Sequence, residues 1–339
     1  MSTPGLSPAE QSFISPHLKH IWASKGVDQS QWAKACNQAA NELAQRILAM
    51  RSGTIPMPEH PSLELYKEAA RKREQIAHRI GQAMDFGELR TDKEPLYTIM
   101  SDSGTYGSQF EKIKHAITAL ADKNGIEAAH GLSWKVTKEN KSGLEITTVQ
   151  LIDGDEKIMQ TLQTLKVLET EKTLGDYTSQ LNAQQHPEWH EVLTRSKIRE
   201  ELSVKKEAAL IIHTPGQHVE AMLHRADNAL AQAIQGQGNI EHAIGNAAWV
   251  LGIAAPLRRG SASTSDILIK ALMKANNMEV KPYRADTLNW DLAAIVAPSQ
   301  EEFAKYHALL FEGSTPAADR QWSIDPRNQP GPRPDRKLD

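Results

Sequence analysis

The hydrophobic positions of the chain recur mostly at intervals of three and four residues, which is the spacing that places side chains on one face of an α-helix. Residues 29–50, 62–84 and 215–235 show this pattern most clearly. Gly53 and Gly236 follow the first and the third of these segments, at positions that favour a helix end. The pattern therefore predicts a mainly α-helical protein built as a multi-helix bundle.

Alternation of apolar and polar residues, the pattern of a β-strand, predicts strands in one part of the chain. Residues 132–137 and 144–152 alternate in this way and are joined by a polar segment that contains a glycine. They predict one small β-hairpin. Residues 155–170 and 187–206 return to a helical pattern, and residues 208–214 fit either a strand or the start of a helix.

The most apolar helix and the helix that follows it form the centre of the chain. Residues 240–254 contain almost nothing polar after Asn246, a composition that is typical of a helix buried in the middle of a bundle. A short turn at 256–260 leads directly into a second, amphipathic helix. Four of the first five residues of this second helix carry hydroxyl groups: Ser261, Ser263, Thr264 and Ser265.

Two adjacent arginines, Arg258 and Arg259, stand in that turn immediately before the second helix. The N-terminal end of a helix is partly positive, so two guanidinium groups are unfavourable there unless an anion neutralises them. The pattern predicts an anion- or phosphate-binding site, and it identifies no catalytic residue. The predicted anion-binding residues are Arg258, Arg259, Gly260, Ser261, Ser263, Thr264 and Ser265, with Asp266, His224 and Arg225 as secondary candidates.

A second interpretation of the same turn needs no ligand. In it, the two arginines pair with carboxylates such as those of Asp227, Glu241 or Asp266, or they reach solvent. The sequence leaves both interpretations open, because proximity in space does not follow from order along the chain.

The length of 339 residues and an ordinary apolar content allow one large body with a sizeable core. Three prolines between residues 56 and 61 interrupt the helical pattern and mark a boundary. We expect an N-terminal leader and helical segment at 1–55 and a main helical domain at 60–312. Residues 313–339 are rich in proline, arginine and aspartate without periodicity, so they predict a disordered tail.

The formal net charge of −3 is too small to favour a nucleic-acid partner. No stretch approaches the roughly 18 consecutive apolar residues of a membrane span. The beginning of the chain lacks the basic start and the apolar run of a Sec signal peptide, and its serine- and proline-rich composition is similar to the leaders of bacterial effectors exported by needle-type secretion systems. We expect a soluble protein made in the bacterial cytoplasm, and the leader leaves secretion into a host cell open.

No residue pattern predicts a metal site. The single cysteine, Cys36, lies on a helical apolar pattern, so it is predicted to be a small core residue. His186 and His190 flank Pro187, which favours a helix start between them, so their rings need not share one helix face. Three further histidines match no ligand spacing: His213, His218 and His224.

The order of elements between residues 217 and 282 resembles the core of the Fic/Doc superfamily. In that family a helix ends in the motif H-P-F-x-D/E-G-N-G/K-R and a second helix follows directly. The resembling segment reads IEHAIGNAAWVLGIAAPLRRGSAS and then DILIKALMKANNMEVKP. The resemblance implies a Fic-like helical core. Ala255, however, stands in place of the catalytic histidine and Arg259 in place of the metal-binding acid, so ordinary nucleotide transfer by this motif is not expected.

The chain is also similar to the avirulence-protein-B group of plant-pathogen effectors, divergent members that keep a Fic-like scaffold without the motif. This resemblance implies a nucleotide or nucleotide-sugar donor, whose diphosphate Arg258 and Arg259 would hold. It implies transfer of a nucleotide or sugar group to a target or host protein. Whether the chain is an enzyme stays open: the alternative is a non-catalytic effector that binds a host or partner protein through its helical surface.

Overall fold

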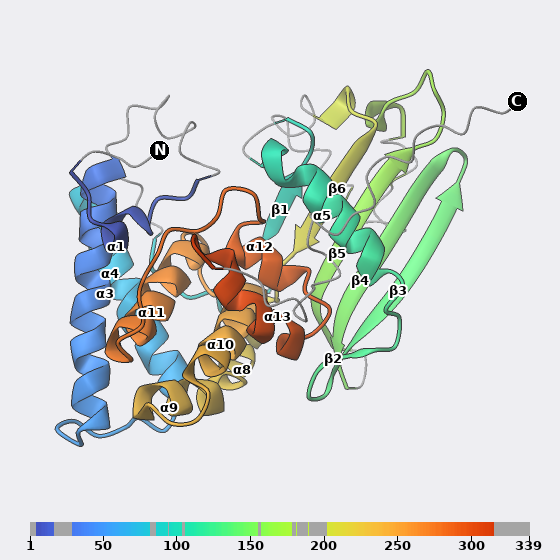
Figure 1. Ribbon diagram of the computed structural model, residues 1–339. Coiled ribbons are helices and arrows are strands. Elements are labelled where there is room, and N and C mark those ends of the chain that lie inside the picture. Colours follow the sequence, from blue (N-terminus) through green and yellow to red (C-terminus); the bar gives the residue numbers. More distant parts are fainter. Residues whose placement is uncertain are drawn as a thin grey trace, which may run out of the picture.

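A body of helices packs against an antiparallel sheet in the computed structural model. Most of the helices lie on one side of Figure 1, and the strands lie on the other together with one helix, α5. The structure describes residues 5–16, 29–81, 86–93, 95–103, 106–154, 157–177, 181, 189 and 202–314. The longer helices are α3 (Gln29–Arg51), α4 (Pro61–Arg79), α5 (Gly107–Leu120), α10 (Ile240–Ala254) and α11 (Ser261–Ala275). The shorter helices are α1 (Pro8–Gln11), α8 (Val219–His224), α9 (Asp227–Gln235), α12 (Trp290–Ile295) and α13 (Gln300–Tyr306).

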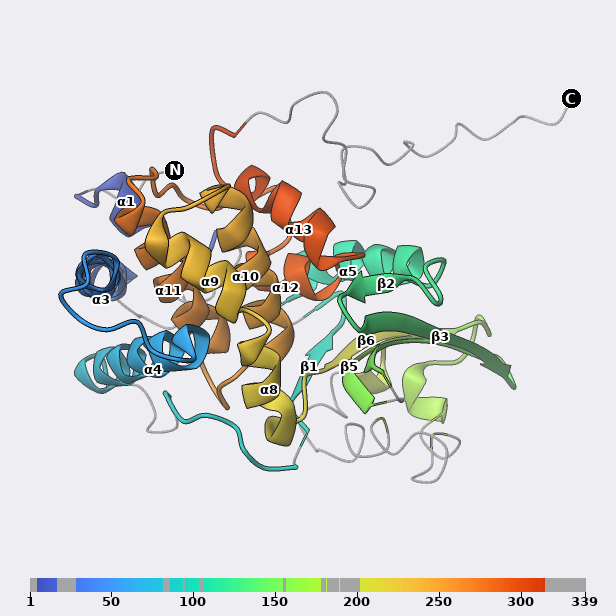
Figure 2. The same cartoon turned by 90° about the horizontal axis from the view of Figure 1, so that it is seen from below.

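The helical body is arranged around α10. α3 and α4 pack on each other at the outer side of the body, α11 contacts both α3 and α10, and α12 and α13 cover another side of α10 (Figures 1 and 2). Between Ala243 and Ala254, every residue of α10 except Asn246 is buried. This confirms the prediction that the most apolar helix lies in the middle of the helices.

Two glycines let neighbouring helices approach α10 closely. A β-carbon on Gly245 would lie 2.7 Å from the Cα atom of Ala304 in α13. A β-carbon on Gly252 would lie 2.7 Å from the β-carbon of Ala294 in α12. Side chains at these two positions would therefore push the helices apart, so the apolar run of α10 specifies close packing as well as burial.

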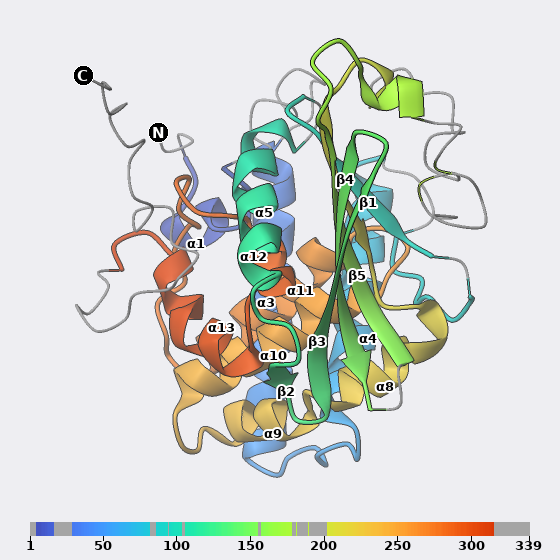
Figure 3. The same ribbon diagram turned by 90° about the vertical axis from the view of Figure 1, so that its right-hand side faces the viewer.

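The strands form one six-stranded sheet in the order β1-β6-β5-β4-β3-β2, with every neighbouring pair antiparallel. α5 runs along one face of this sheet (Figure 3) and contacts three of its four inner strands, β4, β5 and β6. The predicted hairpin is confirmed as β3 and β4, which pair from Leu132↔Asp153 to Lys141↔Leu144. The strands are β1 (Tyr97–Met100), β2 (Glu127–Ala129), β3 (Leu132–Lys141), β4 (Leu144–Asp153), β5 (Lys157–Val167) and β6 (Glu207–Ile212).

The prediction of a mainly α-helical bundle with one small hairpin is wrong, because the hairpin is part of this larger sheet and the fold is a mixed α/β fold. β5, predicted as a helix, pairs along its length with β4 and β6. Its apolar residues Ile158, Leu162 and Leu165 are spaced by four and three, which fits one face of a helix. Burial on both faces in the sheet hides the alternation that marks a half-exposed strand.

The sheet separates two apolar clusters. Val149 and Leu151 of β4 face the main core, which continues into the helical body. Leu144 and Ile146 of the same strand belong to a smaller cluster with Leu174 and other residues beyond the far face. Side chains of one strand thus alternate between two cores, so the sheet is covered on both faces.

The predicted helix at 187–206 lies mostly outside the described residues, and several others are found with shifted ends. The segment 62–84 forms α4, which ends at Arg79, and the segment after Pro215 divides into a 3-10 turn at Gly216–His218, α8 and α9. Ser299 caps α13 by accepting a hydrogen bond from the amide of Glu302 at 3.1 Å, as its sequence predicts.

Some of the predictions lie outside the described residues. These are most of the leader, the histidines at 186 and 190, and the tail from residue 315. None of the helices in the described parts of the chain combines the length and the apolarity that a membrane span needs.

Candidate functional site

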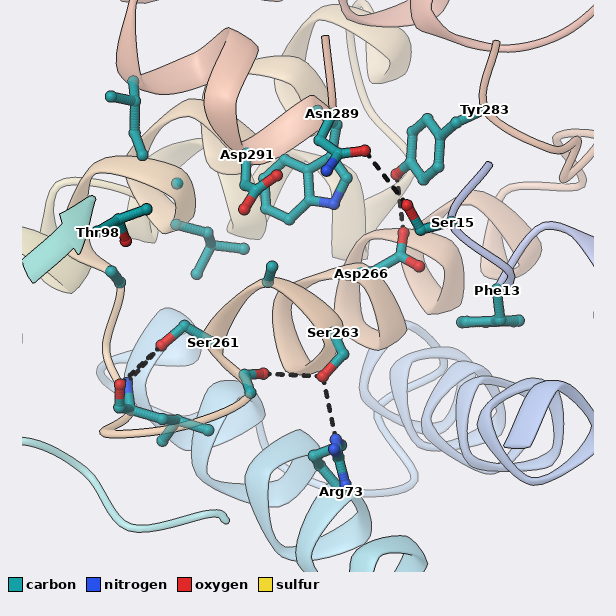
Figure 4. Close-up of a pocket in the computed structure, with 18 of the residues that line it drawn as sticks. Phe13, Ser15, Arg73, Thr98, Ser261, Ser263, Asp266, Tyr283, Asn289 and Asp291 are labelled. Atoms are coloured by element: carbon teal, nitrogen blue, oxygen red, sulfur yellow. Dashed lines mark hydrogen bonds between the residues drawn. The ribbon is translucent and has the colours of Figure 1, made fainter. Parts of the chain in front are cut away.

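A pocket of ≈ 430 Å³ lies where the start of α11 meets the edge strand β1 and the helix α12. Its volume is within the range of small-molecule sites in proteins. Thr98 of β1, Ser261 of α11 and Asp291 of α12 lie on different sides of the hollow (Figure 4). A further wall comes from residues 12–16, near the beginning of the chain.

Hydrogen bonds from Arg90 hold the turn that carries the two arginines in place. α10 ends at Ala255, whose φ of 38° turns the backbone into the left-handed region. The buried guanidinium of Arg90 donates hydrogen bonds to the carbonyls of Ala254 and Ala255, at 3.0 Å each, and to that of Thr214 at 2.7 Å. Burial lowers the pKa of Arg90 to about 10, which still leaves it charged at neutral pH. Arg90 therefore fixes the turn through hydrogen bonds to backbone oxygens.

The two predicted arginines have different positions. Arg258 lines the pocket and forms an ion pair with Asp92, and its side chain is 44% exposed. Arg259 is not part of the pocket wall formed by the described residues, and its guanidinium lies 5.7 Å from the ring centre of Phe86. Arg258 can thus contact a ligand in this pocket, whereas Arg259 is not one of its lining residues. Arg258 pairs with a carboxylate, as the second interpretation of the turn predicts, and the partner is Asp92.

The predicted hydroxyl cluster also divides. Ser261 and Ser263 line the pocket together with Gly260, whereas Thr264 and Ser265 are buried away from it. The Ser261 hydroxyl accepts from the amide of Leu257 at 2.8 Å and donates to the carbonyl of the same residue at 3.0 Å. It therefore closes the arginine turn as well as facing the pocket.

Arg73 of α4 lines the pocket, although it directly follows two other basic residues, Arg71 and Lys72, along the chain. Its side chain is 2% exposed, and its Nε donates to the hydroxyl of Ser263 at 3.0 Å (Figure 4). The guanidinium lies 4.4 Å from the ring centre of Trp32 and 4.0 Å from that of Phe86. Burial lowers its pKa to about 10. Arg73 thus supplies a fixed positive charge in the pocket, held by cation–π contacts.

Asp291 provides one of two carboxylates in the pocket wall, the other being that of Asp266. Burial raises the pKa of Asp291 to about 6, and the nearby charge of Asp266 adds to the effect, although backbone amides of α12 oppose it. The group therefore exchanges its proton close to neutral pH, which is the property that general acid–base chemistry requires. The sequence showed it only as one acid in an otherwise apolar segment.

His213 and Thr98 form the side of the pocket next to the sheet. The Nε2 atom of His213 lies 2.8 Å from the hydroxyl of Thr98, and its buried Nδ1 atom has no hydrogen-bond partner among the described residues. Burial, together with the positive charge of Arg90, lowers the pKa of His213 to about 3. The ring is consequently neutral at physiological pH and offers polar contact without charge.

Asp266, a secondary candidate, stands in the pocket wall as part of a buried network. The ammonium of Lys270 donates to its Oδ2 atom at 2.6 Å and to the carbonyl of Ser12 at 2.6 Å, and the hydroxyl of Tyr283 donates to its Oδ1 atom at 2.7 Å. Lys270 is fully buried, and burial lowers its pKa. These bonds attach the N-terminal wall of the pocket to α11.

The remaining secondary candidates lie outside the pocket wall. Arg225 binds the carboxylate of Asp153 at 2.9 Å and the carbonyl of His130 at 2.7 Å. His224 lies 3.1 Å from a carboxylate oxygen of Asp227. Burial raises the pKa of the Cys36 thiol, and its buried position agrees with the core role predicted from sequence.

The pocket therefore combines cations, carboxylates and neutral hydrogen-bonding groups. The sequence model of the family AvrB_AvrC, described as avirulence protein, matches residues 144–313. This span includes Arg258, His213 and Asp291, while Arg73 and Thr98 precede it. No curated protein matches the chain.

Proposed function

The chain belongs to the AvrB_AvrC avirulence protein family, and we propose that it is an effector that moves a nucleotide or sugar group onto a protein of the target cell. The family suggests a bacterial avirulence effector with a host target protein. The donor, the transfer and the site are the proposed part. A Fic-like core at 217–282 also stays a prediction.

The observation that carries the proposal is the placement of charge in the pocket. Arg258 and Arg73 line it with positive groups, and Asp291 lines it with a carboxylate whose pKa is raised to about 6. Guanidinium groups bind diphosphates through charge-assisted, often bidentate hydrogen bonds. A carboxylate with a pKa near neutrality is suited to accept a proton from an attacking hydroxyl.

In the sugar-transfer form of the proposal, a hydroxyl oxygen of the target protein attacks the anomeric carbon of a nucleotide sugar. The bond between that carbon and the diphosphate oxygen breaks, and the diphosphate leaves with the electron pair. The hydroxyl proton passes to Asp291, and Arg258 and Arg73 stabilise the charge that develops on the diphosphate. In the nucleotide-transfer form the same hydroxyl oxygen attacks the phosphorus next to the nucleoside. The bond between that phosphorus and its bridging oxygen breaks, the remaining phosphate group leaves with the electron pair, and the hydroxyl proton passes to Asp291.

Calorimetry and thermal melting with a panel of nucleoside diphosphates and nucleotide sugars test the proposal. We expect at least one compound to bind and to raise the melting temperature, since a ligand that binds only the folded state stabilises it. Arg258→Ala should abolish most of this response because it removes a pocket cation. Arg259→Ala is the matched control and should keep it, because Arg259 is outside the pocket wall.

An equal loss in both variants would contradict the assignment of the pocket. Absence of any response to the panel, with binding of a target protein intact in Arg258→Ala, would favour the non-catalytic effector instead. That interpretation places the interaction on the helical surface.

A further inference from the structure

We propose that His60, His224 and Asp227 form a binding site for a divalent transition-metal ion of the zinc class. The three residues meet where α4 begins, α8 ends and α9 begins. Each offers one ligand atom, and these atoms all lie within 4.8 Å of one another. None of the three belongs to the wall of the pocket described above.

The distances suit a metal ion between the three side chains. The Nδ1 atom of His60 and the Nδ1 atom of His224 each lie 3.1 Å from the Oδ2 atom of Asp227. Zinc binds imidazole nitrogen and carboxylate oxygen at about 2.0–2.1 Å in tetrahedral geometry, so neighbouring ligand atoms are roughly 3.3 Å apart. The observed separations need only small side-chain movements to accept an ion.

The carboxylate of Asp227 is already oriented for such a role. Its Oδ1 atom accepts hydrogen bonds from the amide of Ser62 at 3.0 Å and from the hydroxyl of Ser62 at 2.6 Å. One carboxylate oxygen is therefore fixed by serine and the other is directed at the two imidazoles, as carboxylate ligands of metals commonly are.

A role as a helix cap accounts for only half of this arrangement. Asp227 caps α4 through Ser62, and that contact uses Oδ1 alone. It does not explain why two imidazoles also converge on Oδ2 with their ring centres 4.0 Å apart. Two imidazole nitrogens and a carboxylate oxygen are the ligand set that zinc and its neighbours prefer, with the fourth position left for water.

The remaining surroundings are also compatible with an ion. The side chain of His60 is 47% exposed, so an ion can enter from solvent. The Nε2 atom of His224, on the side of the ring away from Asp227, lies 3.7 Å from a carboxylate oxygen of Glu220. A carboxylate near the outer nitrogen of a metal-bound imidazole orients the ring. The site would tie the beginning of α4 to the junction of α8 and α9.

Titration of metal-free full-length protein with Zn²⁺ in a calorimeter tests the proposal, with Co²⁺ as a spectroscopic probe of tetrahedral coordination. We expect one tight site per chain and a higher melting temperature with Zn²⁺. His60→Ala and His224→Ala should each remove it. Ser62→Ala, which keeps all ligands and the amide bond to Oδ1 but removes the hydroxyl bond to the same oxygen, should weaken the affinity about 10-fold.

His242→Ala is the matched control, because this histidine also pairs with a carboxylate, that of Glu301 at 2.9 Å, but has no second imidazole beside it among the described residues. It should leave zinc affinity unchanged. Circular dichroism of every variant verifies that the fold is retained. Zinc affinity that is the same in His60→Ala as in the unaltered chain would overturn the proposal, as would the absence of a tight site.

Discussion

Arg73 shows how a single side chain can be misjudged from its neighbours along the chain. The adjacent Arg71 and Lys72 suggest a charged outer face of α4, yet Arg73 shares the buried stripe with Ala69 and Ile76. Arg73 follows Ala69 by four residues and precedes Ile76 by three, so the helical spacing alone predicts that it lies on the buried face. A charged residue on an apolar stripe is costly unless it has partners, and here the partners are aromatic rings and Ser263.

We expect Arg73→Met to weaken binding of a nucleotide about 10–100-fold, the equivalent of roughly 1.5–3 kcal/mol for a lost hydrogen bond to a charged group. The melting temperature should change little, because methionine fills much of the same space without a buried charge. Calorimetry and thermal melting measure the two effects. Arg71→Met, on the exposed side of the same helix, should alter neither.

Asp291 gives the proposed transfer reaction a defined pH dependence. The carboxylate accepts a proton only when it is ionised, so the rate should rise as the pH passes through about 6 and level off above it. Asp291→Asn should lower the rate about 10²–10⁴-fold and remove this rise, while nucleotide binding persists. Initial rates between pH 5 and 8 provide the measurement. An unchanged profile in the variant would show that another group accepts the proton.

At the scale of elements, α10 and β5 differ most in how well the sequence predicts their conformation. The helix α10 could be predicted because its apolar composition has one physical outcome, burial on all sides. β5 could not, because polar residues such as Gln160, Thr161 and Gln163 are buried in it beside apolar ones. The alternation of a half-exposed strand is therefore lost, and the spacing of the apolar residues fits a helix by chance. Pairing with β4 and β6 determines its conformation, and pairing partners are distant in sequence.

The glycines of α10 provide a test at this scale. Gly245→Ala places a β-carbon 2.7 Å from the backbone of Ala304, and backbone cannot move aside as a flexible side chain can. We expect a loss of about 1–3 kcal/mol in the free energy of unfolding, as in other overpacked cores. Glu241→Ala, at an exposed position of the same helix, should cost less than about 1 kcal/mol. Denaturant titration of the three proteins distinguishes the two costs.

At the scale of the whole molecule, the pocket is assembled from segments that are far apart along the chain. The sequence indicated the turn at 256–260 correctly as a concentration of positive charge, and Arg258, Ser261 and Ser263 do line the pocket. It could not indicate Thr98 or the segment 12–16, because their position depends on the sheet and on contacts across the molecule. Predicted anion-binding residues such as Thr264 do not line the pocket, because they lie on the buried face of α11.

Arg90 joins the end of α10 to Thr214 by hydrogen bonds, so its removal should affect both the stability of the fold and the shape of the pocket. We expect Arg90→Met to lower the free energy of unfolding by roughly 2–5 kcal/mol, because three buried carbonyls lose a donor. Nucleotide binding should weaken as well, since the arginine turn loses its support. Arg225→Met removes a surface ion pair instead and should cost less than about 1 kcal/mol. Equal stability of the two variants would contradict this role of Arg90.

The bond between Lys270 and the carbonyl of Ser12 has a consequence for the order of assembly. Ser15 likewise bonds to Asn289. Whether the polypeptide leaves a ribosome or passes through a narrow channel with its N-terminus leading, the first wall of the pocket emerges long before the residues that receive it. That wall can contact α3 early, through the bond from Trp32 to the carbonyl of Phe13. Its bonds to Lys270 and Asn289 form only after almost the entire domain has followed, so the binding site is completed last.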